Sequence, residues 1–523
     1  MMKRILKGTK HIVIIVAAMF GTVACLEKYP GSAIPQDEAM KTFNDAQQHL
    51  TGVYSSLKSS ALYSGLLTLL PDIQADLVNA VEGNSNTYGN IYQWKVLAND
   101  PSVEAVYASL YSVIGNCNFF LDNVANVRES VTVDQQLDLL DEYTGQVYAV
   151  RALCYSELIK FFCKAYDPET AKSEKGVVLR TKYYEPEPTV RASLFDSYGL
   201  VIKDLERAEK LLDGKQDKSD NMFLTLGAVQ AIHARVALYM QDWDAAIKYS
   251  TILIEGREGQ SNAYALSSGM IQGGVYGQAA YSQFDGLWYF DKGSEIIWKI
   301  GFTPTSAGGA LGSVFLNYTR DMVYFYPDYV PSQWVLDLYT EKDSRYMAYF
   351  ADSEITGIEM GYAHKLAWPV LVKYFGNREF TNNYLLFHVN MPKPLRLAEQ
   401  YLIRAEAYCR STTQQNYGKA SQDLNALRSA RIAQGGKLSL GADNWLKEIS
   451  NERVRELYME GFRLQDLKRW KQGFERKNPK VAGIQKEGSD LKVSVDNPLF
   501  VWPIPKHELE SPGSQITPND SNR

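Results

Sequence analysis

The stretch Asn451–Trp470, NERVRELYMEGFRLQDLKRW, places acidic and basic side chains close together among large apolar residues. Its carboxylates are Glu452, Glu456, Glu460 and Asp466. Two carboxyl groups about 5–9 Å apart are enough to cleave a glycosidic bond, one as general acid and one as base or nucleophile. The stretch therefore raises the question of a glycan-cleaving active site.

The spacing within this stretch favours a scaffold role instead. Glu456 and Glu460 lie four residues apart, and Arg453 and Arg463 each lie three residues from one of them, which suits ion pairs on a helix surface. Apolar residues recur at helical intervals and predict the buried stripe of one helix, formed by Val454, Leu457, Tyr458, Leu464 and Leu467. We therefore assign the stretch to the scaffold and expect no catalytic residue in it.

The rest of the chain contains no common catalytic motif: no GxSxG, HExxH, P-loop or GxGxxG sequence, and no EF-hand loop. His233 and His388 stand in apolar surroundings, which is typical of core histidines. Cys154 and Cys163 lie nine residues apart in a helical pattern, so they face opposite sides of that helix. Because no Cys/His cluster has zinc spacing, the cysteines after residue 25 are predicted to be buried free thiols, and no metal site is predicted.

Two long segments, 81–101 and 267–293, lack helical periodicity and are rich in Asn, Gly and aromatic residues. Sugar rings present apolar faces edged by hydroxyl groups, so a sugar site needs flat aromatic side chains next to matched polar groups. The first segment offers Tyr88, Asn90, Tyr92 and Trp94, and the second offers Tyr276, Tyr281, Gln283, Asp285 and Trp288. From these we predict a ligand-binding set of Tyr88, Asn90, Tyr92, Trp94, Tyr281 and Trp288.

The alternative interpretation is that these aromatic side chains anchor the loops or belong to the core. The sequence EIIWKI after Trp288 is typical of a strand that could bury this tryptophan.

The elements that must position these loops are helices. LAEQYLIRAEAYC places Ala398, Leu402, Ala405 and Cys409 on one apolar stripe, and an earlier segment around 228–253 repeats the pattern with Asp242 as N-cap of its second helix. Helix, short turn and helix with small residues at the contact is the tetratricopeptide (TPR) pattern. We predict a mostly α fold: a TPR-like superhelical scaffold of helix pairs with irregular loops and a few short strands.

The N-terminus has the features of a bacterial lipoprotein signal. The apolar run Ile12–Ala24 follows a basic start and is too short to span a bilayer. Its last residues and Cys25 form the sequence TVAC, so the segment matches a secretory signal that ends at Cys25. Residues 1–24 are predicted to be removed, and Cys25 is predicted to carry the lipid that anchors the chain to the membrane. Residues 25–42 would then be a tether.

The charge of the chain excludes some partners. Residues 1–24 carry four basic and no acidic residues, so removal of this segment changes the formal net charge from −5 to −9. An acidic protein lacks the dense Lys and Arg surface that nucleic acid requires. For the same reason, an electrostatic grip on anionic lipid is not expected.

Several segments together resemble the SusD/RagB family. The stretch Asn451–Trp470 is similar to its ERxxELxxEGxRxxDLxRW segment, RLAEQYLIRAEAY with DLNALRSAR is similar to RxAExxLxxAEA and LNxxR, and FVWPIPKHELE contains its PIPxxE motif. VRASLFDSYGLVIKDLERAEKLL and YSVIGNCNFFLDNV look like its N-terminal half. The chain departs from the pattern in two places: FFCKAYDPETAKSEKG replaces a YGDVP-like sequence, and ESPGSQITPND replaces NPxLxQNPGY.

The resemblance implies a SusD-like fold with an N-terminal half at 43–260 and a C-terminal half with ligand-facing loops at 261–523, packed as one compact unit. It implies a non-catalytic lipoprotein at the outer membrane that faces the cell exterior, captures an oligosaccharide and delivers it to a SusC-like TonB-dependent transporter. Peptide binding of the RagB type is the alternative ligand, and no cofactor is implied. A bound calcium ion is compatible with the sequence, although no residue demands it.

Two other classes of protein compete with this interpretation. A surface endo-glycanase would release new reducing ends from polysaccharide, and a TPR-type assembly protein would bind a protein partner and no small ligand. The absence of catalytic motifs argues against the first, and the aromatic loops argue against the second.

Overall fold

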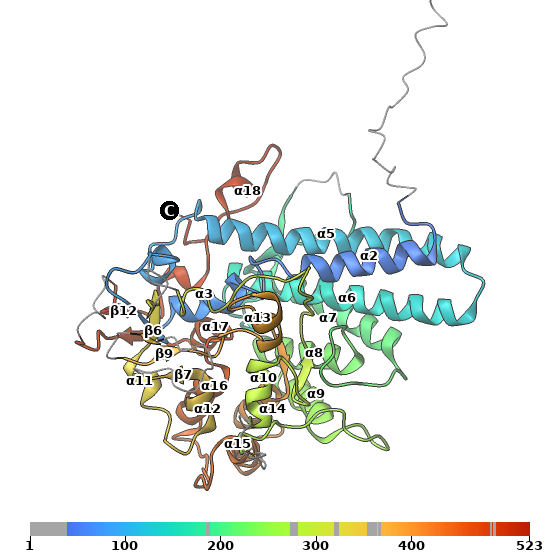
Figure 1. Ribbon diagram of the computed structural model, residues 1–523. Coiled ribbons are helices and arrows are strands. Elements are labelled where there is room, and N and C mark those ends of the chain that lie inside the picture. The colour runs from blue at the N-terminus through green and yellow to red at the C-terminus, as the bar shows by residue number, and fades with distance from the viewer. Residues whose placement is uncertain are drawn as a thin grey trace, which may run out of the picture.

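The protein is described by a computed structural model that covers residues 39–184, 189–271, 281–317, 324–352, 363–364, 368–481, 484 and 488–522. The predicted signal peptide, Cys25, most of the tether and Tyr276 lie outside these residues. Helices dominate (Figure 1). The longest are α5 (Pro101–Ser130) and α6 (Asp134–Phe162), which pack side by side with α2 (Phe43–Ser56). The start of α5 is set locally, because the Asp100 side chain accepts a hydrogen bond from Ser102 N and Pro101 occupies the first turn.

The TPR-like helix pairs are present. Helix α7 (Leu194–Leu212) packs along α6, α8 (Leu226–Met240) and α9 (Trp243–Glu255) form one hairpin, and α14 (Leu397–Arg410) and α15 (Tyr417–Arg431) form another. Asp242 caps α9 by accepting a hydrogen bond from Ala245 N, as predicted.

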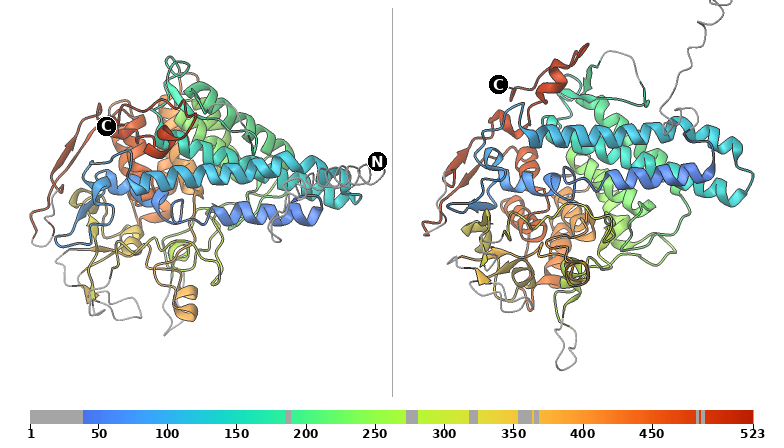
Figure 2. Two further views of the ribbon diagram at one scale, coloured as in Figure 1. Left: turned by 90° about the horizontal axis from the view of Figure 1, so that it is seen from above. Right: turned by 45° about the horizontal axis from the view of Figure 1, so that its top comes forward.

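Helices α9 and α14 lie against each other, so the two hairpins stack although about 150 residues of chain separate them. The contact is built on fully buried small side chains, Ala246 and Ala398 among them, which allow close approach of the helices. In both views of Figure 2 the green helices α7 to α9 lie beside the cyan long helices. The predicted fold class is confirmed.

The strands are short and occur in pairs. Each pair joins segments that lie far apart or on either side of a loop, namely β1 (Val78–Ala80) with β6 (Tyr329–Pro331), β4 (Ile296–Trp298) with β10 (Leu395–Arg396), β2 (Lys175–Val178) with β3 (Arg191–Ser193), β7 (Phe350–Ala351) with β9 (Val370–Leu371), β11 (Phe474–Arg476) with β12 (Leu491–Val493), and the parallel pair β5 (Tyr324–Phe325) with β8 (Ala363–His364). The β1–β6 pair ties the N-terminal half to the C-terminal half by backbone hydrogen bonds.

Shorter helices complete the C-terminal half and the connections. They are α3 (Leu66–Gln74), α4 (Gly89–Tyr92), α10 (Gln283–Tyr289), α11 (Gln333–Leu336), α12 (Ser344–Tyr349), α13 (Arg378–Tyr384), α16 (Trp445–Leu457), α17 (Arg463–Arg469), α18 (Lys506–Glu510) and the 3₁₀ helix η2 (Pro498–Phe500). Within the described residues, none of the helices combines the length and the apolar character needed to span a bilayer.

The stretch Asn451–Trp470 is not one helix, which corrects the sequence prediction. Helix α16 ends at Leu457, and α17 begins at Arg463 after a turn in which Gly461 has φ +85°. The buried Asp72 carboxylate accepts hydrogen bonds from Gly461 N (3.0 Å) and Arg463 N (2.9 Å) and so holds this turn. A residue almost 400 positions away stabilises the break, which is why local periodicity did not predict it.

The WPIP segment is extended and docked against the helices. Trp502 is fully buried; its backbone N donates to the Phe161 carbonyl (2.8 Å), and its indole Nε1 donates to Gln74 Oε1 (2.8 Å). Pro503 and Pro505 have no N–H to satisfy, so the segment can be buried without a strand partner.

Candidate functional site

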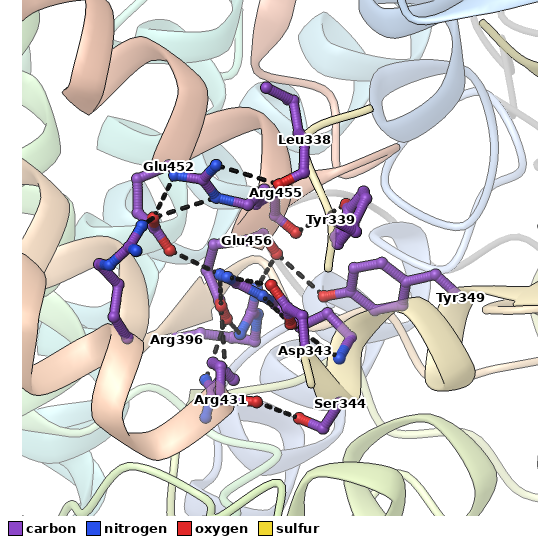
Figure 3. Close-up of polar contacts among 12 residues, drawn as sticks. Leu338, Tyr339, Asp343, Ser344, Tyr349, Arg396, Arg431, Glu452, Arg455 and Glu456 are labelled. Atoms are coloured by element: carbon purple, nitrogen blue, oxygen red, sulfur yellow. Dashed lines mark hydrogen bonds and ion pairs between the residues drawn. The ribbon is translucent and has the colours of Figure 1, made fainter. Parts of the chain in front are cut away.

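Glu452 and Glu456 belong to a buried ion-pair network (Figure 3). Glu456 Oε1 accepts from Arg396 Nη1 (3.0 Å) and Arg431 Nη2 (3.0 Å), and its Oε2 accepts from Arg345 Nη1 (3.1 Å) and Arg431 Nε (3.0 Å). All four side chains are at most 1% exposed. The network therefore joins β10, α12, α15 and α16 through one carboxylate.

Glu452 extends the network by one helical turn. It accepts from Arg345 Nη1 (2.7 Å), Arg455 Nη2 (2.6 Å) and Arg428 Nη1 (3.2 Å), while Asp343 pairs with Arg345 Nη2 (2.7 Å). Figure 3 shows that these side chains converge from several elements around α16.

The electrostatics of this network are those of a structural core. Burial alone would raise the pKa of Glu456, but the guanidinium groups of Arg431, Arg396 and Arg345 outweigh it and hold this pKa far below its ordinary value. By the same balance, the pKa of Glu452 falls to about 2. Neither carboxyl group can donate a proton near neutral pH, and neither is exposed to a substrate. The pair therefore lacks the properties of a general acid and base.

The ion-pair partners differ from those expected from sequence spacing. Arg453 pairs with Asp466 (2.6 Å) and Arg463 pairs with Asp76 (2.8 Å), so neither arginine pairs with Glu456 or Glu460. The pairs are also buried, whereas a helix-surface position was expected. The reason is that α16 is covered on several sides, so partners come from other elements.

Two of the six predicted ligand residues, Tyr92 and Trp94, are side chains of the core. Trp94 is 8% exposed; its Nε1 donates to the Gln74 carbonyl (2.6 Å), and its ring packs on Phe474 and Phe500 at centroid distances of 5.6 and 5.0 Å. The Tyr92 ring lies under the Arg476 guanidinium at 3.6 Å. Neither ring offers a free face for a sugar, because residues from the C-terminal part of the chain cover both.

Trp288 is also buried, with an exposed fraction of 2%. Its ring lies beneath the ammonium groups of Lys373 (4.1 Å to the centroid) and Lys393 (5.0 Å) and near the Arg396 guanidinium (5.4 Å). The β4 strand that follows it, Ile296–Trp298, fits the alternative interpretation from sequence, in which this segment buries Trp288. In this structure Trp288 is a core aromatic that stacks with buried cations.

Tyr88 and Asn90 lie at the surface, on the segment 82–90, which is a loop up to Tyr88 and then enters α4. The segment 326–329 holds this loop in place. Tyr88 is half-buried and Asn90 is exposed. The Asp328 carboxylate accepts from Ser85 N and Ser85 Oγ, both at 2.7 Å. Tyr326, which is 37% exposed, donates its hydroxyl proton to the Glu82 carbonyl (2.7 Å).

We call Tyr88, Asn90 and Tyr326 the tyrosine rim, because they lie on these two segments and are accessible at least in part. Burial, together with the charge of Asp328, raises the pKa of Tyr88, so its phenol stays neutral and can donate and accept hydrogen bonds. Sequence reasoning missed Tyr326. The motif YFYPDY at 324–329 was the available signal, but nothing local links it to loop 82–90.

Tyr281 lies at a second surface position, apart from the rim. Arg378 of α13 donates to the Tyr281 hydroxyl, and its guanidinium lies over the rings of Tyr281 (4.8 Å) and Tyr289 (5.0 Å). Asp285 is occupied in the capping box of α10, where it accepts from Ser282 N (2.9 Å). Gln283 is exposed.

The histidine and cysteine predictions are confirmed for the described residues. Burial lowers the pKa of His388 to about 4, and His233 stacks on Tyr249 with its Nδ1 3.0 Å from Glu209 Oε1. The cysteines from Cys117 to Cys409 are free and buried. Across the residues that the structure describes, no three His, Cys, Asp or Glu side chains gather in a way that could hold a metal ion.

A cavity is present whose described lining contains no residue of the predicted aromatic loops. It has a volume of about 780 Å³ and is formed by the segment 164–175 after α6, by Lys468 and Lys471, and by the C-terminal segments 495–501 and 519–520. We call it the C-terminal cleft. A second cavity of about 560 Å³ lies between segments 214–219 and 252–264.

Comparison with known proteins agrees with this architecture. A sequence model of the SusD family matches residues 294–519, and a second, SusD-like model described as "Starch-binding associating with outer membrane" matches residues 27–238. The two matches together span most of the chain, which belongs to the SusD family.

Individual relatives are distant but cover almost the whole chain. SusD-like protein P25 of Formosa agariphila is 25% identical over 505 residues, covering 88% of this chain and 90% of its own length. A SusD superfamily structure from Bacteroides thetaiotaomicron has a TM-score of 0.73 at 22% identity and covers 91% of this chain and 99% of its own. A SusD-like carbohydrate binding protein from Bacteroides vulgatus has a TM-score of 0.71 at 19% identity, covering 91% of this chain and 98% of its own.

Proposed function

We propose that this protein is a non-catalytic lipoprotein that captures an oligosaccharide at the outer membrane and delivers it to a SusC-like TonB-dependent transporter. Membership of the SusD family supports the proposal, as does the similarity to a structure described as a SusD-like carbohydrate binding protein. The description of the N-terminal family model names both starch binding and the outer membrane. The TVAC sequence that ends at Cys25 supports the proposed lipid anchor, and the proposed orientation toward the cell exterior rests on the family resemblance.

The observation that carries the proposal is the tyrosine rim. Tyr88, Asn90 and Tyr326 present two phenols and an amide on segments fixed by hydrogen bonds to Asp328 and Glu82. Aromatic faces can stack on sugar rings, and the amide and hydroxyl groups can bond sugar hydroxyls, so the rim has the chemistry a glycan needs. At Tyr281 an aromatic ring and the Arg378 guanidinium also lie together, and we retain Tyr281 in the proposed site.

The test is glycan binding by variants of the rim. A glycan array should identify a ligand, and calorimetry with that ligand should show a loss of about tenfold or more in affinity for Tyr88→Ala and Tyr326→Ala, as expected when a stacked ring at the centre of a site is removed. Tyr184→Ala is the matched control, because Tyr184 is a tyrosine 76% exposed on a different segment.

Binding of peptides rather than glycans on a matching peptide array would favour the RagB-type alternative. Release of new reducing ends from polysaccharide would contradict the non-catalytic part. Mass spectrometry of the mature protein tests the lipid at Cys25, and co-purification from outer membranes tests the transporter partner.

A further inference from the structure

The C-terminal cleft is polar, and ion pairs compensate part of its charge. Lys164 pairs with Glu174 (3.2 Å), Lys471 pairs with Asp167 (3.3 Å), and Lys175 donates to the Pro518 carbonyl (2.8 Å). Phe500 and Val501 add apolar surface. With about 780 Å³, the cleft has the volume of small-molecule sites in general.

Lys468 differs from the other lysines of the cleft in its burial: it is half-buried, whereas Lys164, Lys175 and Lys471 are exposed. Its Nζ donates to the backbone carbonyls of Lys160 and Cys163, at the end of α6, and takes part in no ion pair among the described residues. A helix C-terminus supplies only about half a negative charge. The third N–H of the ammonium and part of its positive charge are therefore available to a hydrogen-bond acceptor in the cleft.

The walls of this cleft coincide with the two places where the chain departs from the family sequence pattern. FFCKAYDPETAKSEKG contributes the segment 164–175, and the C-terminal residues that replace the NPxLxQNPGY ending contribute Asn519 and Asp520. The shape of the cleft is thus a property of this chain's own sequence.

We propose that the C-terminal cleft is a second ligand site, which binds a carboxylate-bearing ligand with Lys468 as the cation that pairs with the carboxylate. This site shares no residue with the tyrosine rim, so a negative result at one site would not decide whether the other binds a ligand. The carboxylate can come from a sugar acid or from the C-terminus of a short peptide, and both supply the same charge and hydrogen-bond acceptors.

The position of Lys468 gives the site a pH signature. Burial lowers the pKa of Lys468 to about 7, and the nearby Lys160 ammonium acts in the same direction. A bound carboxylate favours the ammonium form, so binding takes up protons near neutral pH and weakens as the pH rises above 7. The titratable groups that face Lys468 or line the cleft beside it are Lys160, Cys163, Lys164, Asp167, Glu174, Lys175, Lys471, Asp496 and Asp520.

The experiment is calorimetry of the mature protein with four probes: trigalacturonate, neutral galactotriose, N-acetyl-trialanine and N-acetyl-trialanine amide. We expect trigalacturonate or N-acetyl-trialanine to bind and the matching neutral probe to bind at least about tenfold more weakly, as for the loss of a charge-assisted hydrogen bond. The pair that shows this difference identifies the source of the carboxylate. Titration in two buffers of different ionisation enthalpy should show proton uptake at pH 7.

Two variants localise the binding. Lys468→Met removes the cation, and Val495→Trp fills the cleft from an exposed position without touching Lys468, so it remains informative if Lys468→Met does not fold. Both should lose the carboxylate preference, whereas Val190→Trp, at an exposed valine outside the cleft, should retain it. Equal affinity for acidic and neutral probes, no binding of any probe, or binding that Val495→Trp leaves unchanged would each overturn the proposal.

Discussion

Arg431 and Glu456 form a two-point ion pair at the contact of α15 with α16: Nε donates to Oε2 and Nη2 donates to Oε1, both at 3.0 Å, and neither side chain is exposed. Arg431 also reaches Glu295 Oε2 (2.8 Å), the residue before β4. This pair therefore connects the second TPR-like hairpin to the start of β4. In the folded protein, the glutamate-rich stretch Asn451–Trp470 therefore connects neighbouring elements by ion pairs.

Glu456→Gln should lower the free energy of unfolding by about 3–5 kcal/mol, because three buried guanidinium groups lose their shared carboxylate. Urea unfolding followed by circular dichroism measures the change. Glu475→Gln, at an exposed glutamate whose nearest lysine nitrogen is 3.9 Å away, should change stability by less than about 1 kcal/mol. Equal effects of the two substitutions would show that the network does not stabilise the fold.

Trp94→Phe should reduce stability and leave glycan affinity unchanged. The substitution removes the indole donor, and the buried Gln74 carbonyl then loses a partner, at a cost of about 1–3 kcal/mol. Thermal unfolding and calorimetry with the array-selected glycan give the two readouts. A large loss of affinity in a variant of unchanged stability would place Trp94 in the binding site after all.

Gly461→Ala should be strongly destabilising, by more than about 2 kcal/mol, because φ is +85° and a Cβ would lie 2.4 Å from the Leu67 carbonyl oxygen. Gly52→Ala is the matched control: Gly52 lies within α2, and an added Cβ would have no atom within 4 Å, so helix propensity predicts a gain of about 0.5–1 kcal/mol. Opposite changes in the unfolding midpoint are expected.

Asp72 should make stability depend on pH. Burial raises its pKa to about 7 in the folded protein, against 3.8 as the ordinary value, although the N–H groups of Arg463 and Gly461 oppose the shift. The folded state thus holds the proton more tightly, so this contribution to stability is complete below about pH 4 and is lost as the pH rises through 7.

Asp72→Asn tests this by the slope of stability against pH. The variant should be less stable overall, because the single amide oxygen cannot replace both carboxylate oxygens, which accept from Gly461 N and Arg463 N. Its stability should fall less steeply between pH 5 and pH 8 than that of the wild type. Parallel curves would mean that Asp72 is not the titrating group.

Much of the scaffold follows from local sequence. The Asp242 cap and the buried face of α9 follow from residues spaced three and four apart. Helices α8 and α14 are buried on nearly every side, which their apolar stripes alone did not predict. Reasoning from local sequence identified the family motifs and the core histidines and cysteines. It also placed ligand contacts in loops 81–101 and 267–293, of which the rim residues Tyr88 and Asn90 lie at the surface.

What the sequence determined by itself is therefore the helical repeat, the caps and the family. The tertiary structure alone decided which aromatic rings are covered: Trp94 is closed off by Phe474 and Phe500, nearly 400 residues away, and Tyr326 is brought to loop 82–90 by the β1–β6 pair. The tertiary structure also decided that Asn451–Trp470 forms two helices, because Asp72 holds the turn between them. Charged residues of this stretch likewise pair with residues far away in the sequence. The physical reason is that helix formation depends on near neighbours, whereas burial and charge pairing depend on whatever segment the completed fold brings into contact.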